Sequence, residues 1–232
     1  VPNQQDLASL NQQIIQIEAS LNTLESKSRA LQDESPLNFT GSGGRQRLSG
    51  CKLMGSHVAI VMDISASMLE TTVPDVYALQ NEIDGVQLKA PKWRSAVKSL
   101  QWILGSFSTQ TKYQAYIFND EIKAIKDNTE DTWLEAKNQP ELEVVASNIE
   151  TIIPHGGTNL QNAMLSLQKL DPVPDSIWII TDGLPNQKGN SDRYEKVSVS
   201  DRYKYFLAAQ KDMPDLASLN VILLPFEGDV KA

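Results

Sequence analysis

Apolar residues near the start of the chain recur three and four positions apart, which is the spacing of a coiled-coil seam. No Gly or Pro occurs from Asn3 to Ser35, so we expect one continuous helix over residues 1–35. Because a lone helix would leave this stripe in water, we expect residues 7–31 to pair with a second copy, to pack onto the rest of the chain, or to be the remnant of a truncated segment. The seam residues are Leu7, Leu10, Ile14, Ile17, Leu21, Leu24 and Leu31.

Residues 36–48 are predicted to form a flexible hinge. Pro36 ends the helical pattern, and Gly41–Gly44 contains three glycines and one serine. The remaining residues, 49–232, are expected to form one globular domain, because a chain of 232 residues with 41% hydrophobic residues can bury one full core.

Beyond the hinge, short apolar runs alternate with amphipathic stretches, which is typical of βαβ units around a parallel sheet. The runs at 58–62 and 177–180 lack polar alternation and therefore predict central strands covered on both faces. Right-handed crossovers then give a doubly wound, mainly parallel, Rossmann-like α/β sheet. We expect strands at 58–62, 113–118, 177–181 and 221–226, and helices at 92–107, 141–152, 159–170 and 200–213. The helix at 92–107 has a core-facing stripe of Trp93, Val97, Leu100, Leu104 and Phe107.

Charge and cysteine content exclude several function classes. Acidic residues outnumber basic ones, 29 to 21, and the basic residues are scattered, so no nucleic-acid partner is expected. Cys51 is the only cysteine, which excludes an internal disulfide and a cysteine-rich zinc site. The sequence contains no apolar stretch long enough to span a membrane and does not start like a signal peptide. Membrane attachment is therefore expected only through an anchor not in this chain.

Oxygen-bearing side chains follow the two predicted central strands and precede one helix. Asp63, Ser65 and Ser67 follow the first strand, Thr158 precedes a helix, and Asp182 follows the other central strand. Each motif alone is typical of an ordinary turn or helix cap. Ligands of open α/β sheets bind at the carboxyl ends of strands, so the three segments together predict one shared site. Oxygen ligands suit Mg²⁺, Mn²⁺ or Ca²⁺ and fit zinc or copper poorly.

The order Asp63-x-Ser65-x-Ser67, Thr158 and Asp182 resembles the metal-ion-dependent adhesion site of the von Willebrand factor A (vWA) family. The resemblance covers roughly residues 49–226. The chain also resembles vWA domain-containing proteins of bacteria. The resemblance implies that the two serines and the threonine bind the metal directly, while the two aspartates act largely through water. One coordination position is then open to a Glu or Asp carboxylate from a protein partner.

Glycines accompany the candidate site, and Gly156, Gly157 and Gly183 are expected to allow close approach of the backbone. His155 lies beside the site in the sequence and is interpreted as structural or solvent-facing.

The sequence departs from the family pattern at two places. An insertion at 69–91 follows the Asp63–Ser67 segment and carries several acidic residues, so it either acts as a lid or specificity element or is an ordinary surface excursion. The chain also ends directly after its last predicted strand, where the family continues with further elements. We therefore expect a truncated C-terminal end and an exposed sheet edge. The acidic residues of the insertion are Glu70, Asp75, Glu82 and Asp84.

The favoured function is a metal-dependent protein–protein interaction module without enzymatic activity, whose N-terminal helix sets oligomeric state or distance from an anchor. By analogy with bacterial vWA proteins that carry a coiled coil, we expect a bacterial envelope location with tethering to the inner membrane. One alternative is a Mg²⁺-dependent phosphohydrolase of the haloacid dehalogenase type, which needs an aspartate where Ser65 stands. Another is a purely structural assembly protein with a vestigial metal site. No phosphate-binding Gly-rich run or nucleophile-elbow pattern occurs in the sequence.

Overall fold

The computed structural model describes residues 47–48, 51–52, 55–188 and 197–227. Contacts divide the chain into two units, Val1–Arg47 and Leu48–Ala232. The predicted coiled-coil helix and nearly all of the hinge lie outside the described residues. The helix, its pairing and the bounds of the hinge therefore stay predictions.

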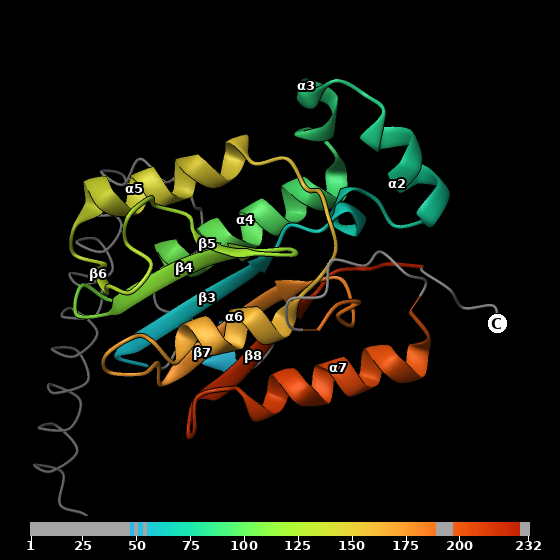
Figure 1. Cartoon of the computed structure of the whole chain (residues 1–232). Coiled ribbons are helices and arrows are strands. Elements are labelled where there is room, and N and C mark those ends of the chain that lie inside the picture. Colours follow the sequence, from blue (N-terminus) through green and yellow to red (C-terminus); the bar gives the residue numbers. More distant parts are fainter. Residues whose placement is uncertain (1–46, 49–50, 53–54, 189–196, 228–232) are drawn as a thin grey trace, which may run out of the picture. The chain divides into compact units, whose positions relative to one another are not determined.

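A six-stranded sheet forms the centre of the second unit (Figure 1). Its hydrogen-bonded order is β5-β4-β3-β7-β8, and β6 pairs with β4 off this path. Strands β3, β4, β7 and β8 are parallel to their neighbours in this order, whereas β5 and β6 run antiparallel to β4. The prediction of a mainly parallel α/β sheet is confirmed, and the two short antiparallel strands are an addition to it. The strands are β3 (His57–Asp63), β4 (Lys112–Phe118), β5 (Ile122–Ala124), β6 (Leu134–Glu135), β7 (Ser176–Thr181) and β8 (Ser218–Leu223), with β1 (Arg47–Leu48) and β2 (Cys51–Lys52) paired separately.

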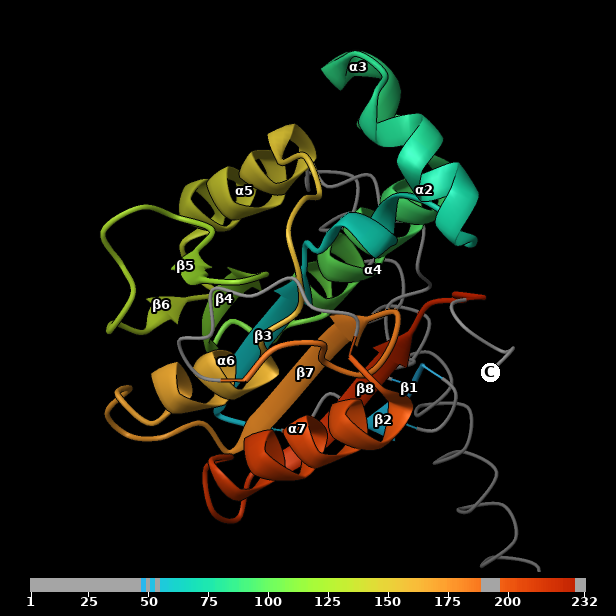
Figure 2. The same cartoon turned by 45° about the vertical axis from the view of Figure 1, so that its right-hand side comes forward.

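Helices α4 and α5 cover one face of this sheet, and α6 and α7 cover the other (Figures 1 and 2). The four predicted helices are present with ends that shift by one to three residues, and the last turn of the second becomes η2. The insertion contains α2 and α3, which the sequence pattern does not predict. Within the described ranges, no helix has both the length and the apolarity needed to cross a membrane. The helices are α2 (Val73–Gln80), α3 (Asp84–Gln87), α4 (Pro91–Gly105), α5 (Gln139–Asn148), α6 (Leu160–Leu167) and α7 (Val199–Lys211), with 3-10 turns η1 (Ala66–Leu69) and η2 (Ile149–Thr151).

The middle of the sheet is buried from both sides, as the unbroken apolar runs predict. Every residue of β7 is buried, and so is every residue of β3 after His57. The stripe of α4 packs on this sheet, where Trp93, Val97 and Leu100 are all 0% exposed. The site residues at the ends of β3 and β7 thus follow two fully buried strands at the centre of the sheet.

The last strand, β8, differs from its prediction. It runs over Ser218–Leu223 and not over 221–226, because Pro225 has no N–H with which to continue the ladder. Among the described residues, no strand pairs with its outer side. Val221 and Leu223 are 50% and 68% exposed, so β8 is the edge of the described part of the sheet and carries exposed apolar side chains.

Candidate metal site

The candidate site lies where β3 and β7 end side by side (Figure 1). Met62 of β3 pairs with Ile180 of β7, so the next residues, Asp63 and Thr181, are neighbours across the two strand ends. The hydroxyl of Thr181 donates a hydrogen bond of 2.7 Å to Oδ2 of Asp63. Asp182 follows Thr181 directly. Parallel pairing therefore brings together two carboxylates that lie 119 positions apart in the chain.

Asp63 is completely buried and shapes the turn that follows β3. Its Oδ1 accepts a hydrogen bond of 2.8 Å from the backbone N–H of Ser65, which is the local bond that Asp side chains typically make in turns. Asp63 is 0% exposed. Burial, followed by the charge of Asp182, raises the pKa of Asp63 to about 7. The hydrogen bonds from Ser65 and Thr181 favour the ionised form but do not offset the loss of water.

The two serines of the turn point toward each other and toward the second carboxylate. The hydroxyl oxygens of Ser65 and Ser67 are 3.1 Å apart. The hydroxyl of Ser67 donates to Oδ1 of Asp182 at 3.1 Å. A continuous series of contacts thus joins four of the five residues singled out in the sequence, from Asp63 through both serines to Asp182.

The fifth residue, Thr158, lies on a loop that contacts both strand ends. Backbone Ala66 N–H donates to Gly156 O at 3.2 Å, which ties this loop to the turn after β3. On the other side, Oδ1 of Asn186, from the loop after β7, accepts from Thr158 N–H at 2.8 Å. Thr158 itself is 6% exposed. The structure therefore places the Thr158 backbone between the two segments that carry the other four residues.

Glycine is favoured at two positions of the Thr158 loop. A Cβ on Gly157 would lie 2.6 Å from the Gln187 side chain and 2.8 Å from that of Asn186. Gly156 has a φ of +78°, where residues with a side chain are strained. The expectation of close backbone approach is wrong for Gly183, because a Cβ there would meet only Arg202, at 3.6 Å.

Lys92 is a site residue that the sequence analysis did not single out. It lies in the first turn of α4 and is 6% exposed. Its ammonium donates to Oδ2 of Asp182 at 2.7 Å, to Ser67 O at 2.9 Å and to Glu70 O at 3.0 Å. The same nitrogen lies 4.7 Å from the centre of the Phe226 ring. A signal was present in the sequence, since the first turn of a helix disfavours a cation.

The residues next to the site have local roles. His155 is exposed, as expected, and its ring Nδ1 lies 2.9 Å from Ile153 O. In the insertion, Asp75 bonds to the Thr72 side chain at the start of α2. The part of the insertion nearest the site is tied to the segment after β8, because Glu227 N–H donates to Thr71 O at 2.6 Å.

The residues of the site fit a hard divalent cation. Among the described residues, no three His, Cys, Asp or Glu side chains gather closely enough to hold a metal ion, and the candidate site instead combines its two carboxylates with hydroxyls. Here two carboxylates and the convergent Ser65 and Ser67 hydroxyls offer oxygen atoms alone, which suits Mg²⁺ and related ions. The printed hydrogen bonds to the Asp63 carboxylate come from neutral donors, the Ser65 N–H and the Thr181 hydroxyl.

No family model matches the chain, and no curated protein matches it. Among solved structures, a von Willebrand factor type A protein from Catenulispora acidiphila is similar at 12% identity and a TM-score of 0.45, covering 72% of this chain and 38% of that one. The PilB minor pilin from Streptococcus sanguinis is similar at 17% identity and a TM-score of 0.46, with coverages of 73% and 50%. An aerotolerance-related membrane protein from Bacteroides fragilis is similar at 17% identity and a TM-score of 0.43, with coverages of 76% and 75%. At these identities and TM-scores the similarities assign neither a family nor a function.

Proposed function

We propose that this chain is a metal-dependent protein-binding domain of the vWA type. Asp63, Ser65, Ser67, Thr158 and Asp182 would hold one Mg²⁺, or Mn²⁺ or Ca²⁺ in its place. The observation that carries the proposal is the series of contacts from Asp63 through the two serines to Asp182 at the ends of β3 and β7. The order of these residues in the sequence supports the same site.

In this proposal the hydroxyls of the two serines and of Thr158 bind the ion, and the aspartates orient them or hold its water. When bound, the ion supplies a positive charge that neutral hydroxyls do not quench. Asp63 fixes the turn through the Ser65 N–H, and Asp182 accepts from Ser67. A partner's Glu or Asp carboxylate would complete the coordination, because Mg²⁺ retains exchangeable waters.

The buried position of Asp63 favours a protein-binding function over a phosphohydrolase. In a phosphohydrolase of the haloacid dehalogenase type, the aspartate after the central strand must reach a substrate phosphate. Asp63 is 0% exposed, and its two oxygens accept hydrogen bonds from Ser65 and Thr181. Ser65 also occupies the position of the second aspartate that such an enzyme needs. A purely structural protein with a vestigial site is the remaining alternative.

The other parts of the proposal concern assembly and location. Pairing through residues 7–31 would present several copies of the domain to a repeated partner and increase avidity. Tethering at a bacterial envelope would require an anchor outside this chain. A net charge of −8 disfavours nucleic acid as a partner.

The experiment that tests the proposal is a Mg²⁺ and Mn²⁺ titration of EDTA-treated full chain, followed by thermal unfolding. Saturable stabilisation is expected in the parent, at about 2.7 kcal/mol when the ion concentration is 100 times Kd. It should be lost in Asp63→Ala and in Ser65→Ala/Ser67→Ala. Asp127→Ala is the matched control, because the Asp127 side chain is 71% exposed and pairs with Lys123. Absence of saturable stabilisation in the parent would leave the structural alternative.

A further inference from the structure

The buried ammonium of Lys92 is the feature of the site that a metal-binding role alone does not explain. The Lys92 and Asp182 side chains are 3% and 5% exposed, and their charged atoms are 2.7 Å apart. Two backbone carbonyls, from Ser67 and Glu70, take the remaining donor capacity of the ammonium. Lys92 is therefore fixed in place within a few ångströms of Ser67, which is itself a candidate ligand.

Binding of a divalent ion would change the net charge of the buried groups at the site. With Asp63 and Asp182 both ionised, as metal binding requires, these two carboxylates and the ammonium of Lys92 carry one net negative charge before the metal is added. A divalent cation would change this to one net positive charge. Glu70, Asp120 and Arg202 also lie nearby but are only partly buried, so water and salt screen them more strongly. One further anionic group would make the buried site neutral.

We infer that Lys92 couples the uptake of the metal to the binding of an anionic group, an inference that rests on the proposed function. In the metal-free protein, the ammonium of Lys92 supplies the positive charge beside Asp182. It repels a divalent ion that binds without an accompanying anion. Repulsion between like charges is strong where water is excluded. A carboxylate that binds together with the ion removes the excess positive charge, so each ligand increases the affinity for the other.

A different role for Lys92 predicts the opposite sign. If Lys92 only positions Asp182 for the metal, then removal of its charge releases the carboxylate and weakens metal binding. Loss of a positioning group of this kind typically costs about 10–100-fold in affinity. The direction of the change in metal affinity therefore separates the two roles.

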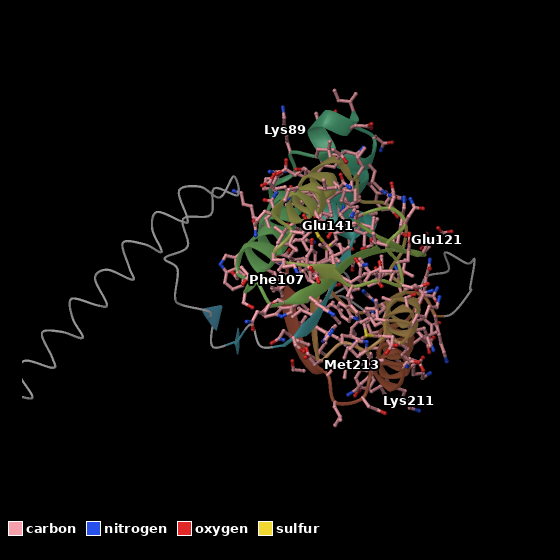
Figure 3. All side chains as sticks on the ribbon, turned by 90° about the vertical axis from the view of Figure 1, so that its left-hand side faces the viewer. Lys89, Phe107, Glu121, Glu141, Lys211 and Met213 are labelled. Atoms are coloured by element: carbon pink, nitrogen blue, oxygen red, sulfur yellow. The ribbon has the colours of Figure 1, made fainter. Side chains whose placement is uncertain are left out.

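The test measures Mg²⁺ affinity by calorimetry on the full chain, with and without sodium acetate at matched ionic strength. The variants are Lys92→Gln, which removes the charge, and Lys92→Arg, which keeps it. Lys89→Gln is the matched control, because Lys89 lies on the surface where the insertion leads into α4 (Figure 3). The melting temperature of each metal-free variant is recorded alongside.

The expected results differ for each protein. In the parent, acetate should tighten Mg²⁺ binding by about fivefold or more. Lys92→Gln should bind Mg²⁺ about tenfold more tightly than the parent without acetate, lose most of the acetate effect, and melt at a lower temperature when metal-free. Lys92→Arg and Lys89→Gln should behave like the parent.

Two results would overturn the inference while leaving the proposed function intact. One is Mg²⁺ binding to the parent that acetate does not change, a measurement that holds even if Lys92→Gln does not fold. The other is a folded Lys92→Gln that binds Mg²⁺ no more tightly than the parent. No Mg²⁺ binding to the parent, with or without acetate, would remove the proposed function as well.

Discussion

The two carboxylates of the candidate site end neighbouring strands but have opposite electrostatic surroundings. Asp63, in the turn after β3, accepts hydrogen bonds only from neutral donors among its described contacts, the Ser65 N–H and the Thr181 hydroxyl. Asp182, after β7, is bonded to the ammonium of Lys92 and to the hydroxyl of Ser67. The described contacts of Asp63 therefore include no cationic side chain, whereas Asp182 is paired with the ammonium of Lys92.

In the proposed metal site, this difference would keep the metal-free protein folded while leaving one carboxylate available to a cation. Burying an ionised carboxylate without a counter-charge costs folding free energy. Burial accordingly raises the pKa of Asp63 to about 7. Two unpaired carboxylates side by side would cost more free energy still, because they repel each other. Lys92 lowers this cost by pairing with Asp182. The shortage of positive charge that remains lies at the β3 turn, where the hydroxyls of Ser65 and Ser67 meet.

The largest effect is expected from Asp182→Asn, which leaves the Lys92 ammonium buried without its partner. The free energy of unfolding of the metal-free protein should fall by about 3–5 kcal/mol. Denaturation in urea measures it. The control is Asp127→Asn, which removes an exposed ion pair with Lys123 and should cost about 0–1 kcal/mol. A loss at Asp182 no larger than in this control would contradict the assigned role of the Lys92 pair.

Thr181→Val tests how much a neutral hydrogen-bond donor supports the Asp63 carboxylate. The substitution keeps the shape of the side chain but removes the hydrogen bond to Oδ2 of Asp63. Unfolding should become easier by about 1.5–3 kcal/mol, because the acceptor is a buried carboxylate, and metal affinity should fall by about 10–100-fold. Thr151→Val, which removes an exposed bond to Asn148 O, is the control. Equal effects in both variants would mean that Thr181 does not support Asp63.

Asp63→Asn should act in the opposite direction from Asp182→Asn. The pKa of Asp63 is higher in the folded protein than in an unfolded chain, so ionisation of this group costs stability, and the full cost applies above about pH 7. Roughly one pH unit above that value, the metal-free variant should be more stable than the parent by about 1–2 kcal/mol while losing its metal response. Urea denaturation without metal checks the sign. A destabilised variant would show that Asp63 is already compensated.

The smallest effect is expected from Tyr77→Ala in the insertion. Tyr77 lies on α2 and is 65% exposed, so its removal should change stability by less than about 0.5 kcal/mol. Metal affinity should stay within about twofold of the parent, because outer-shell effects of 10–100-fold require contact with the ligands. Calorimetry with Mg²⁺ measures it. A larger loss of affinity would place the insertion in the metal site and support its role as a lid.

The predictable parts of the molecule are those that local sequence determines. The unbroken apolar runs of β3 and β7 identify the central strands, and the strand ends place Asp63 and Asp182 at one edge of the sheet. Strands β5 and β6 are three and two residues long, too short to show any periodicity. Their pairing depends on the surface that β4 offers.

The sequence carries one weak signal for Lys92, a cation in the first turn of a helix, but this signal does not reveal which groups Lys92 contacts. Its burial depends on the arrangement of η1, the end of β7 and Phe226, which are brought together only in the folded chain. The sequence alone shows a lysine after Pro91, and most such lysines are solvated. Thr181 was likewise visible in the sequence, but its bond to Asp63 follows from strand register.

Anomalous scattering from crystals of this chain soaked in Mn²⁺ tests directly whether the β3 turn accepts a divalent cation, as we propose. One strong anomalous peak is expected at coordination distance, about 2.0–2.6 Å, from the Ser65 and Ser67 hydroxyls. Lys92 should remain bonded to Asp182. Absence of a peak at these hydroxyls under saturating Mn²⁺ and acetate, or a peak only at surface carboxylates, would contradict the claim.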